Sequence, residues 1–446
     1  MHTKGWIIIL VILMMATLTG CSKAGNRVKE IDQDLTLFVA TDLHYLAKEL
    51  NDQGDAFQAY MANSDGKLLY YITDIVDAFA QDIIKKKPEV LIISGDLTNN
   101  GERESHREMA EKLAEVEEAS GTRIYVIPGN HDIQNPWARG FQGEEQYVTD
   151  SIQAEEFAKF YNQFGYEEAI SKDESSLSYL AAPSEDLYLL MLDTNIYEFN
   201  EMLGSPMTNG QLKPETLVWI RECSKLAKEK NAQIITVMHH NLYNHSKLLN
   251  AGFTIDRSSE VLQVFKECEL KLVLSGHIHI QDIKAGDAEE PIYDIVTTAL
   301  GVNPVQYGVI EYSYEKGYQY TTERVDVEGW AKEKGISDEN LLGFQEYAEN
   351  YFEKTSYDKV YNKLYETGIY SEEEILLMTE TMSLLNRNYF AGTTADIKDE
   401  VMKSQGYQLW KDADDTTFFK KYVISMAEDS KQSHRKIFIP LTEKKE

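Results

Sequence analysis

Cysteine is scarce in this sequence, with 3 residues among 446. Cys21 falls in the N-terminal segment considered below, whereas Cys223 and Cys268 each lie inside a stretch with helical periodicity. Two such thiols do not make a disulfide framework, so the fold has to be stabilised by an ordinary hydrophobic core. We interpret Cys223 and Cys268 as thiols of that core.

Positive charge is also in short supply, because 44 Lys and Arg residues face 74 Asp and Glu residues and the net charge is -30. Such a surface repels extended nucleic acid, which excludes a nuclease as a favoured function. A small anionic ester remains compatible with this charge, since bound metal ions can dominate the local field. The apolar fraction of 43% is typical of a soluble globular protein, and the length predicts two domains.

An apolar run at residues 6–16 follows the positive charge of Lys4 and is too short to span a bilayer. The next residues, Leu18-Thr19-Gly20-Cys21, resemble a bacterial lipobox. This resemblance implies a signal peptide at 1–20, acylation of Cys21 and a polar tether at 21–34. The alternative is a plain secretory signal in which Cys21 has no role. The lipobox predicts an exported protein, held by its lipid anchor on the extracytoplasmic face of the cell membrane.

Between residues 35 and 283, apolar β-rich runs alternate with helical stretches. The runs are almost continuously apolar, which is typical of strands buried on both faces. This alternation predicts an α/β layered architecture. The expected strands are 35–40, 90–93, 124–127, 188–192, 234–238 and 270–274, and the expected helices are 72–87, 104–119, 215–229 and 260–268.

The remaining segments suggest how the chain is divided. Strand-like runs at 292–297, 308–314 and 319–325 would complete an α/β domain at 35–328. Residues from about 135 to 180 exceed a simple connection and predict an insertion, in which Trp137, Arg139 and Phe141 either line a substrate pocket or belong to an ordinary surface. Residues 329–446 are acidic and Tyr-rich, and they predict a helical C-terminal domain with helices at 341–354, 357–365, 372–386, 394–405 and 416–427.

Five polar clusters follow five of the apolar runs. Because ligands bind beyond the carboxyl ends of strands in open α/β sheets, we expect the clusters to meet at one rim. Carboxylates, imidazoles and an amide oxygen are donors that Mn, Fe, Zn or Co accept, so the set predicts two metal ions sharing Asp96. The clusters are Asp42-Leu43-His44, Gly95-Asp96, Gly129-Asn130-His131-Asp132, His239-His240 and Gly276-His277-Ile278-His279.

Each cluster is weak evidence by itself, since a lone Asp-x-His is usually accidental and a lone strand-end histidine is usually structural. All five in order favour a metal centre. In an extended backbone Asp42 and His44 would share one side. His239 and His240 would point to opposite sides, so only one of them can reach a given metal.

Together the five clusters resemble the signature of the calcineurin-like metallophosphoesterases over about residues 35–325. The resemblance implies a four-layer αββα sandwich with catalytic function at 35–328. It also implies a division of the ligands: Asp42, His44 and His279 for the first metal, Asn130, His239 and His277 for the second, and Asp96 bridging both.

The same resemblance implies roles for the neighbouring residues. His131 would contact the phosphate, beside Asn130, and protonate the leaving oxygen, while Asp132 would hold the ring of His131. The family pattern selects His239 as the metal ligand and leaves His240 as a substrate contact. Two such ions would lower the pKa of a bridging water to near neutrality, and the resulting hydroxide would attack phosphorus in line.

The substrate is less closely defined than the reaction. The His239-His240 step and residues 189–195 look like those of bacterial class III cyclic-nucleotide phosphodiesterases. We therefore expect a phosphodiesterase for a small phosphoester, with 3',5'-cyclic nucleotides as the first candidate. Phosphomonoesters, nucleotides and glycerophosphodiesters are the alternatives, and a non-catalytic scaffold is disfavoured because no ligand is missing. Mn and Fe are the first expected metals, and Zn is compatible.

Overall fold

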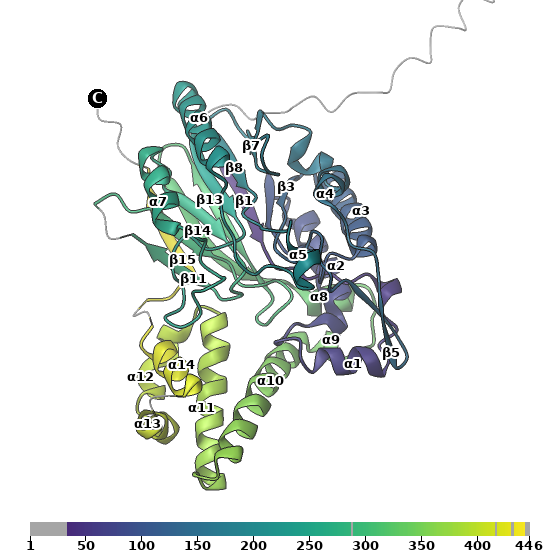
Figure 1. The fold of residues 1–446 in the computed structure, drawn as a ribbon, viewed down its shortest axis with the longest axis vertical. Coiled ribbons are helices and arrows are strands. Elements are labelled where there is room, and N and C mark those ends of the chain that lie inside the picture. The colour runs from purple at the N-terminus through teal and green to yellow at the C-terminus, as the bar shows by residue number, and fades with distance from the viewer. Residues whose placement is uncertain (1–33, 287–288, 415–416, 430–431, 442–446) are drawn as a thin grey trace, which may run out of the picture.

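The computed structural model describes residues 34–286, 289–414, 417–429 and 432–441. The predicted signal segment, Cys21 and all but the last residue of the predicted tether lie outside the described residues. Two β-sheets form the centre of the described structure, and a group of helices extends from one end of them (Figure 1).

The first sheet carries three of the predicted strand ends side by side. Its order is β15-β14-β13-β1-β2-β3, in which β1, β2 and β3 run parallel and β13 is antiparallel to β1. Its strands are β1 (Leu35–Ala40), β2 (Val90–Ser94), β3 (Arg123–Ile127), β13 (Gln306–Ser313), β14 (Gly317–Arg324) and β15 (Lys436–Pro440).

The second sheet carries the other two predicted strand ends that precede polar clusters. Its order is β11-β12-β10-β9-β8-β7-β6, with a parallel centre formed by β12, β10, β9 and β8. Its strands are β6 (Ser171–Lys172), β7 (Tyr179–Ala181), β8 (Leu187–Leu192), β9 (Gln233–Met238), β10 (Leu272–Ser275), β11 (Asp282–Ala285) and β12 (Tyr293–Val296).

Alternate residues along β8 pack into two different hydrophobic cores, one on each face of the second sheet. Leu187 and Leu189 pack into the cluster shared with the first sheet, whereas Leu190 and Leu192 pack against the helices on the other face. Side chains of a strand alternate between its faces, so one sheet face is turned to the other sheet and the opposite face to helices. The predicted α/β sandwich is confirmed.

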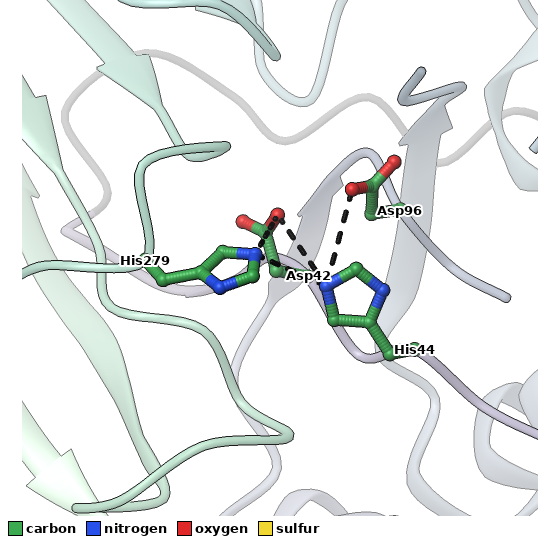
Figure 2. Close-up of side chains that lie close together, drawn as sticks. All are labelled: Asp42, His44, Asp96 and His279. Atoms are coloured by element: carbon green, nitrogen blue, oxygen red, sulfur yellow. Dashed lines mark hydrogen bonds and ion pairs between the residues drawn. The ribbon is translucent and has the colours of Figure 1, made fainter. Parts of the chain in front are cut away.

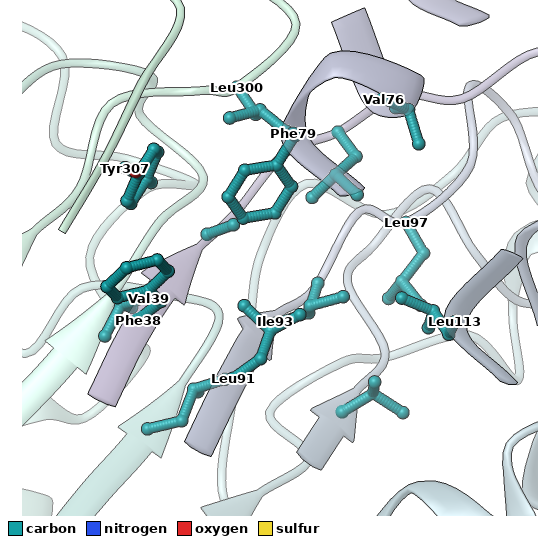
Figure 3. Packing of buried hydrophobic residues seen from close by; sticks show 14 of the residues in the cluster. Phe38, Val39, Val76, Phe79, Leu91, Ile93, Leu97, Leu113, Leu300 and Tyr307 are labelled. Carbon is teal, nitrogen blue, oxygen red and sulfur yellow. The ribbon is translucent and has the colours of Figure 1, made fainter. Parts of the chain in front are cut away.

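Helices cover the outer faces of both sheets. α2 (Ile72–Lys86) and α3 (Arg103–Ser120) lie over the first sheet, and α6 (Pro214–Lys230) and α7 (Ser258–Glu267) lie over the second. Figure 3 shows the first of these contacts, in which the rings of Phe79 on α2 and Tyr307 on β13 have centroids 5.1 Å apart. Each such buried aromatic side chain contributes about 1.5–3 kcal/mol of hydrophobic stabilisation.

The C-terminal residues form helices, as predicted, but three details were wrong. The predicted helices 341–354 and 357–365 are mostly one helix, which continues through Thr355, whose hydroxyl donates to the Tyr351 carbonyl at 3.0 Å. The predicted helix 394–405 ends early, and Ser404 caps a new helix by accepting from Tyr407 N at 3.2 Å. Strand β15 was not predicted. The helices are α8 (Val327–Glu333), α9 (Glu339–Leu342), α10 (Phe344–Thr367), α11 (Glu372–Phe390), α12 (Thr394–Val401), α13 (Gln405–Asp412) and α14 (Phe418–Ala427).

The segment predicted as an insertion forms a hairpin, a helix and two short edge strands. Phe141 is buried in the hairpin against Phe57 and Tyr60, so neither of the two alternatives for it, a substrate pocket or an ordinary surface, is correct. Trp137 is exposed, and the Arg139 guanidinium donates to the neighbouring backbone carbonyls. The hairpin strands are β4 (Arg139–Gln142) and β5 (Glu145–Val148), and the helix is α4 (Ala154–Phe160).

Both cysteines of the described residues are free and buried, as predicted. Cys223 lies in α6, and Cys268 directly follows α7 rather than lying inside it. Burial raises the pKa of the Cys223 thiol to about 12, which keeps it protonated and unreactive. Among the described residues, none of the helices has the length and apolar character needed to cross a bilayer.

Candidate metal centre

The ends of five strands converge on one rim. Asp42, Asp96 and Asn130 follow the adjacent strands β1, β2 and β3, and His239 and His277 follow the adjacent strands β9 and β10. Their side chains form two groups of close ligand atoms that share Asp96. The first group is Asp42, His44, Asp96 and His279, and the second is Asp96, His239 and His277.

The side chains of the first group point toward one another (Figure 2). The Nε2 atoms of His44 and His279 lie 3.1 Å apart, and His279 Nε2 is 3.2 Å from Asp42 Oδ1. His44 Nε2 lies 3.9 Å from Asp96 Oδ2. Ligand atoms at about 2.1 Å from one ion are about 3.0–3.4 Å apart in octahedral or tetrahedral geometry, so the 3.1 and 3.2 Å distances fit a common metal, whereas His44 and Asp96 would have to move slightly closer. Asp42 Oδ1 is buried without a hydrogen bond, which leaves it available as a ligand.

The second group uses the same carboxylate oxygen of Asp96. His239 Nε2 lies 3.5 Å from Asp96 Oδ2 and 3.2 Å from Asn130 Oδ1. Asp96 Oδ1 accepts a hydrogen bond from His131 N at 2.9 Å, so Oδ2 is the oxygen turned to both groups. A single oxygen between two sets of donors is the arrangement that a bridging ligand requires.

Outer hydrogen bonds decide which ring nitrogens remain available. His239 Nδ1 donates to the Ser94 carbonyl at 2.9 Å, which leaves Nε2 for a metal. His277 Nε2 donates to the carbonyls of Thr208 and Gly252 at 3.1 and 2.9 Å, which leaves Nδ1. Metal-binding histidines ordinarily donate their second N–H in this way.

The backbone of this rim is unusual. Five of the candidate ligands have positive φ angles in the left-handed region: Asp42 at 51°, His44 at 50°, Asp96 at 49°, His277 at 70° and His279 at 64°. Non-glycine residues adopt this conformation rarely, and such strain concentrates at functional sites. The extended backbone expected for Asp42 and His44 is therefore wrong, because a loop rather than strand alternation brings them together.

Gly276, a glycine of the fifth cluster, lies where the loop after β10 closely approaches the loop after β1. A Cβ on Gly276 would lie 2.0 Å from Thr41 Oγ1 and 2.6 Å from Asp42 Oδ2. Any side chain there would push the β10 loop away from the β1 loop and separate the two halves of the rim.

His131 lies beside the first group, with its ring edge-on to that of His44 and the centroids 5.1 Å apart. Its Nδ1 lies 2.9 Å from the Asn99 carbonyl and 3.0 Å from Asn100 Oδ1. Both partners are acceptors, so Nδ1 carries the hydrogen and Nε2 is the nitrogen left to contact another group. Sequence reasoning missed Asn99 and Asn100, although they follow Gly95-Asp96 by only a few residues.

Asp132 does not hold the ring of His131, which corrects that expectation. Its carboxylate accepts hydrogen bonds from the backbone N–H groups of Leu97, Thr98 and Gly129 at 3.1, 2.9 and 2.8 Å, and from the Thr98 hydroxyl at 2.8 Å. Asp132 therefore ties the loop after β2 to the loop after β3, and it supports His131 only through the backbone.

The ring of His240 packs against that of the candidate ligand His277, with centroids 4.5 Å apart, but the expectation that His240 contacts substrate does not fit its hydrogen bonds. It is fully buried, with Nδ1 2.8 Å from Thr194 Oγ1 and Nε2 3.0 Å from the Thr208 carbonyl. Both ring nitrogens are thus engaged by the protein. Its neighbour His239 belongs to the second ligand group. The two rings lie against each other, with centroids 5.3 Å apart, so the opposite orientation expected for an extended segment is wrong.

Lys67 is a further residue that no sequence pattern indicated. Its Nζ lies 3.3 Å from His44 Nδ1. Burial lowers the pKa of Lys67, while the nearby carboxylates of Asp96 and Asp42 act to raise it. The lysine adds positive charge beside the first group.

The electrostatics of the centre favour cations. Asp42 and Asp96 are 0% and 1% exposed. Burial works to raise the pKa of Asp96, but the imidazoles of His239 and His131 outweigh it and hold this pKa well below its usual range. Burial likewise works to lower the pKa of His239, yet the charge of Asp96 raises it to about 9. Two buried carboxylates with this demand for positive charge fit a pair of metal ions.

Two family profiles and several known proteins are similar to this chain. The profile described as calcineurin-like phosphoesterase matches residues 35–281, and the profile of the C-terminal domain of cyclic nucleotide phosphodiesterase matches residues 326–433. A dimetal phosphatase from Danio rerio of known structure has 11% identity and a TM-score of 0.44, covering 65% of this chain and 95% of that one.

Two curated bacterial proteins are similar in sequence. One from Arcobacter nitrofigilis, named a probable glycerophosphodiester phosphodiesterase, is 25% identical over 227 residues, covering 48% of this chain and 67% of that protein. One from Psychrobacter, named a probable cyclic nucleotide phosphodiesterase, is 22% identical over 205 residues, covering 46% of this chain and 50% of that protein. Because the phosphoesterase profile spans more than half of the chain, this protein belongs to the calcineurin-like phosphoesterase family.

Proposed function

We propose that this protein is a phosphodiesterase that uses two metal ions. The observation that carries the proposal is the pair of ligand groups sharing Asp96 Oδ2. Asp42, His44 and His279 would hold one ion, and Asn130, His239 and His277 would hold the other. Mixed nitrogen and oxygen donors suit Mn and Fe first, and Zn is compatible.

When bound, the two ions would activate water for attack on phosphorus and take up the charge that develops on the phosphoryl oxygens. His131 supplies the proton for the leaving oxygen. Without substrate, burial lowers the pKa of His131 to about 4, so the ring is neutral. A phosphate anion at Nε2, with two acceptors at Nδ1, would raise that pKa, and the protonated ring could then release the Nε2 proton as the ester bond breaks. Asn99 and Asn100 orient this ring.

A cyclic nucleotide is the proposed substrate class. The match of residues 326–433 to the C-terminal domain of cyclic nucleotide phosphodiesterase supports it, as does the name of the Psychrobacter relative. Glycerophosphodiesters are the second candidate, because the Arcobacter relative carries that name. Both candidates are phosphodiesters with a poor alkoxide leaving group, which is the case in which a proton donor such as His131 matters most.

The test is a comparison of kcat/KM on four substrates in the presence of Mn²⁺. They are 3',5'-cyclic AMP, glycerophosphocholine, bis(p-nitrophenyl) phosphate and p-nitrophenyl phosphate. We expect the diesters to be hydrolysed faster than the monoester, with cyclic AMP preferred over glycerophosphocholine. Faster turnover of p-nitrophenyl phosphate would reassign the protein as a phosphomonoesterase, and no turnover of any ester would mark it as a scaffold.

We also propose that the protein is exported and anchored by a lipid on Cys21. The support is the sequence Leu18-Thr19-Gly20-Cys21 behind a short apolar run. A membrane anchor would place the enzyme where it meets phosphoesters outside the cytoplasm.

A further inference from the structure

The loop that carries two candidate ligands is embedded in the C-terminal helices. Ile278, between His277 and His279, is 6% exposed, and Ile280, the residue after His279, is 2% exposed. Both belong to one hydrophobic cluster with residues from α10, α11, α12, α13 and α14. The ligands and the core residues thus alternate along the same short loop.

A second loop of the catalytic domain joins this cluster. Leu248, Leu249 and Phe253, which follow His239 in the chain, pack against the same core. The Phe253 ring lies 5.1 Å from that of His277, and the Gly252 carbonyl accepts from His277 Nε2 at 2.9 Å. The helices therefore hold the residues that orient His277 as well as its own loop.

A chain of polar contacts runs from the C-terminal residues into the same loop. His434 Nδ1 lies 2.5 Å from Asp282 Oδ1, and His245 bridges Asp282 and Asp294 at 2.7 and 3.0 Å. Asp294 also accepts from the Ser275 hydroxyl at 2.8 Å. The side-chain amide of Asn241 then donates to Ser275 Oγ at 3.2 Å and to the Gly276 carbonyl at 2.8 Å.

The helices add two direct bonds to this network. Tyr389 on α11 donates its hydroxyl to the His245 carbonyl at 3.0 Å, and Gln281 N donates to the Phe390 carbonyl at 3.1 Å. Apolar and polar contacts therefore both link α11 to the loop of His277 and His279.

We propose that the C-terminal helices are the scaffold that sets the metal affinity of this centre, with Ile280 and Tyr389 as positioning residues. The proposal rests on the ligand assignment made above. Both candidate ions take a ligand from this loop, so loosening it weakens both. The left-handed φ angles of His277 and His279 have to be imposed from outside, and the packed helices supply that constraint.

The experiment measures Mn²⁺ binding to the full-length protein by calorimetry, without substrate. Ile280→Ala opens a cavity between the loop and the helices, and we expect it to raise the Kd for Mn²⁺ by about 10-fold or more, the scale seen for outer partners of metal ligands. Tyr389→Phe removes only one hydroxyl and should raise the Kd by a smaller factor. The conservative variant Ile280→Val should have a Kd for Mn²⁺ close to that of the parent protein.

The matched control lies in the same hydrophobic cluster but on α13, which is farther from the sheets than α14 (Figure 1). Trp410→Phe should lower the melting temperature without changing the Kd for Mn²⁺. The inference is overturned if Ile280→Ala and Tyr389→Phe keep the parental Kd, or if Trp410→Phe shifts it equally. A parent protein that binds no Mn²⁺ would instead overturn the ligand assignment itself, so the two failures are distinguishable.

Discussion

The Nε2 atoms of His44 and His279 lie 3.1 Å apart, although 235 residues separate them in the chain (Figure 2). Both nitrogens are also within 4 Å of Asp42 Oδ1. Two neutral imidazoles can share only one hydrogen between such nitrogens, whereas a cation would satisfy both together with the carboxylate. The packing of the two sheets thus prepares a ligand set before any ion binds.

Replacing the shared carboxylate should affect both candidate ions. We expect Asp96→Asn to reduce bound metal from two ions per chain to one or none and to lower kcat by about 100-fold or more, because an amide cannot neutralise two cations. Metal content after dialysis and turnover of bis(p-nitrophenyl) phosphate measure the two effects.

Asp173→Asn is the matched control, since Asp173 is another buried carboxylate, whose hydrogen bonds go to Ser175, Ser176 and Thr216. It should keep both ions and full activity. Two ions retained in Asp96→Asn would contradict the bridging role.

If His131 protonates the leaving oxygen, the loss of activity on removing it should depend on the leaving group. We expect His131→Ala to lower kcat on 3',5'-cyclic AMP by about 10²–10⁴-fold, because the departing alkoxide then lacks its proton donor. p-Nitrophenolate leaves without protonation, so the loss on bis(p-nitrophenyl) phosphate should be much smaller. Metal content should stay unchanged.

Asn100→Leu provides a graded companion, because it removes one of the two acceptors at His131 Nδ1 and keeps the other. It should show the same leaving-group pattern with a smaller loss. Equal losses on both esters in His131→Ala would exclude proton donation and leave only phosphate binding as its role.

The apolar and strand-like runs predicted nine strands of the two sheets, and the polar residues after five of them predicted which side chains meet. These features follow from local periodicity and from the general geometry of parallel strands. Strand β15 was not predicted, because Lys436–Pro440 is a short segment and its partner β14 lies more than a hundred residues earlier in the chain. The packing of Ile278 and Ile280 against the C-terminal helices could not be predicted for the same reason, since nothing in the local sequence indicates which domain buries them.

Within the site, residue types were predictable and hydrogen-bond partners were not. His131 was identified, but its ring is held by Asn99 and Asn100 instead of Asp132. His240 was assigned to substrate from its position beside His239, yet its partners come from the distant Thr194 and Thr208. Such contacts depend on loop conformation, which is set by tertiary packing and not by sequence pattern.

The buried His245 predicts a loss of stability at alkaline pH. Burial works to lower its pKa, but the carboxylates of Asp294 and Asp282 raise it from 6.5 to about 9. A raised pKa contributes stability that is complete below about pH 6.5 and lost as the pH rises through 9, here about 3 kcal/mol. The pKa of Asp282 is held well below its usual range, so its contribution is lost only in acid.

Urea unfolding of the metal-free protein at pH 6 and pH 9 tests this expectation. The free energy of unfolding should fall between the two values in the parent protein and should change less in His245→Gln. His434 faces the same Asp282 and also has a raised pKa, so His245→Gln keeps part of the slope. An unchanged slope in His245→Gln would show that the charge of His245 does not contribute.

The proposed anchor makes a prediction that is independent of the metal centre. Acylation requires the thiol of Cys21, so Cys21→Ser should release the protein from the membrane fraction of the producing cells or leave its signal segment uncleaved. Labelling with a radioactive fatty acid should mark the parent protein and not this variant. Cys223→Ser is the control, because that thiol is buried in α6 and should leave labelling unchanged. Labelling that persists in Cys21→Ser would exclude the lipobox.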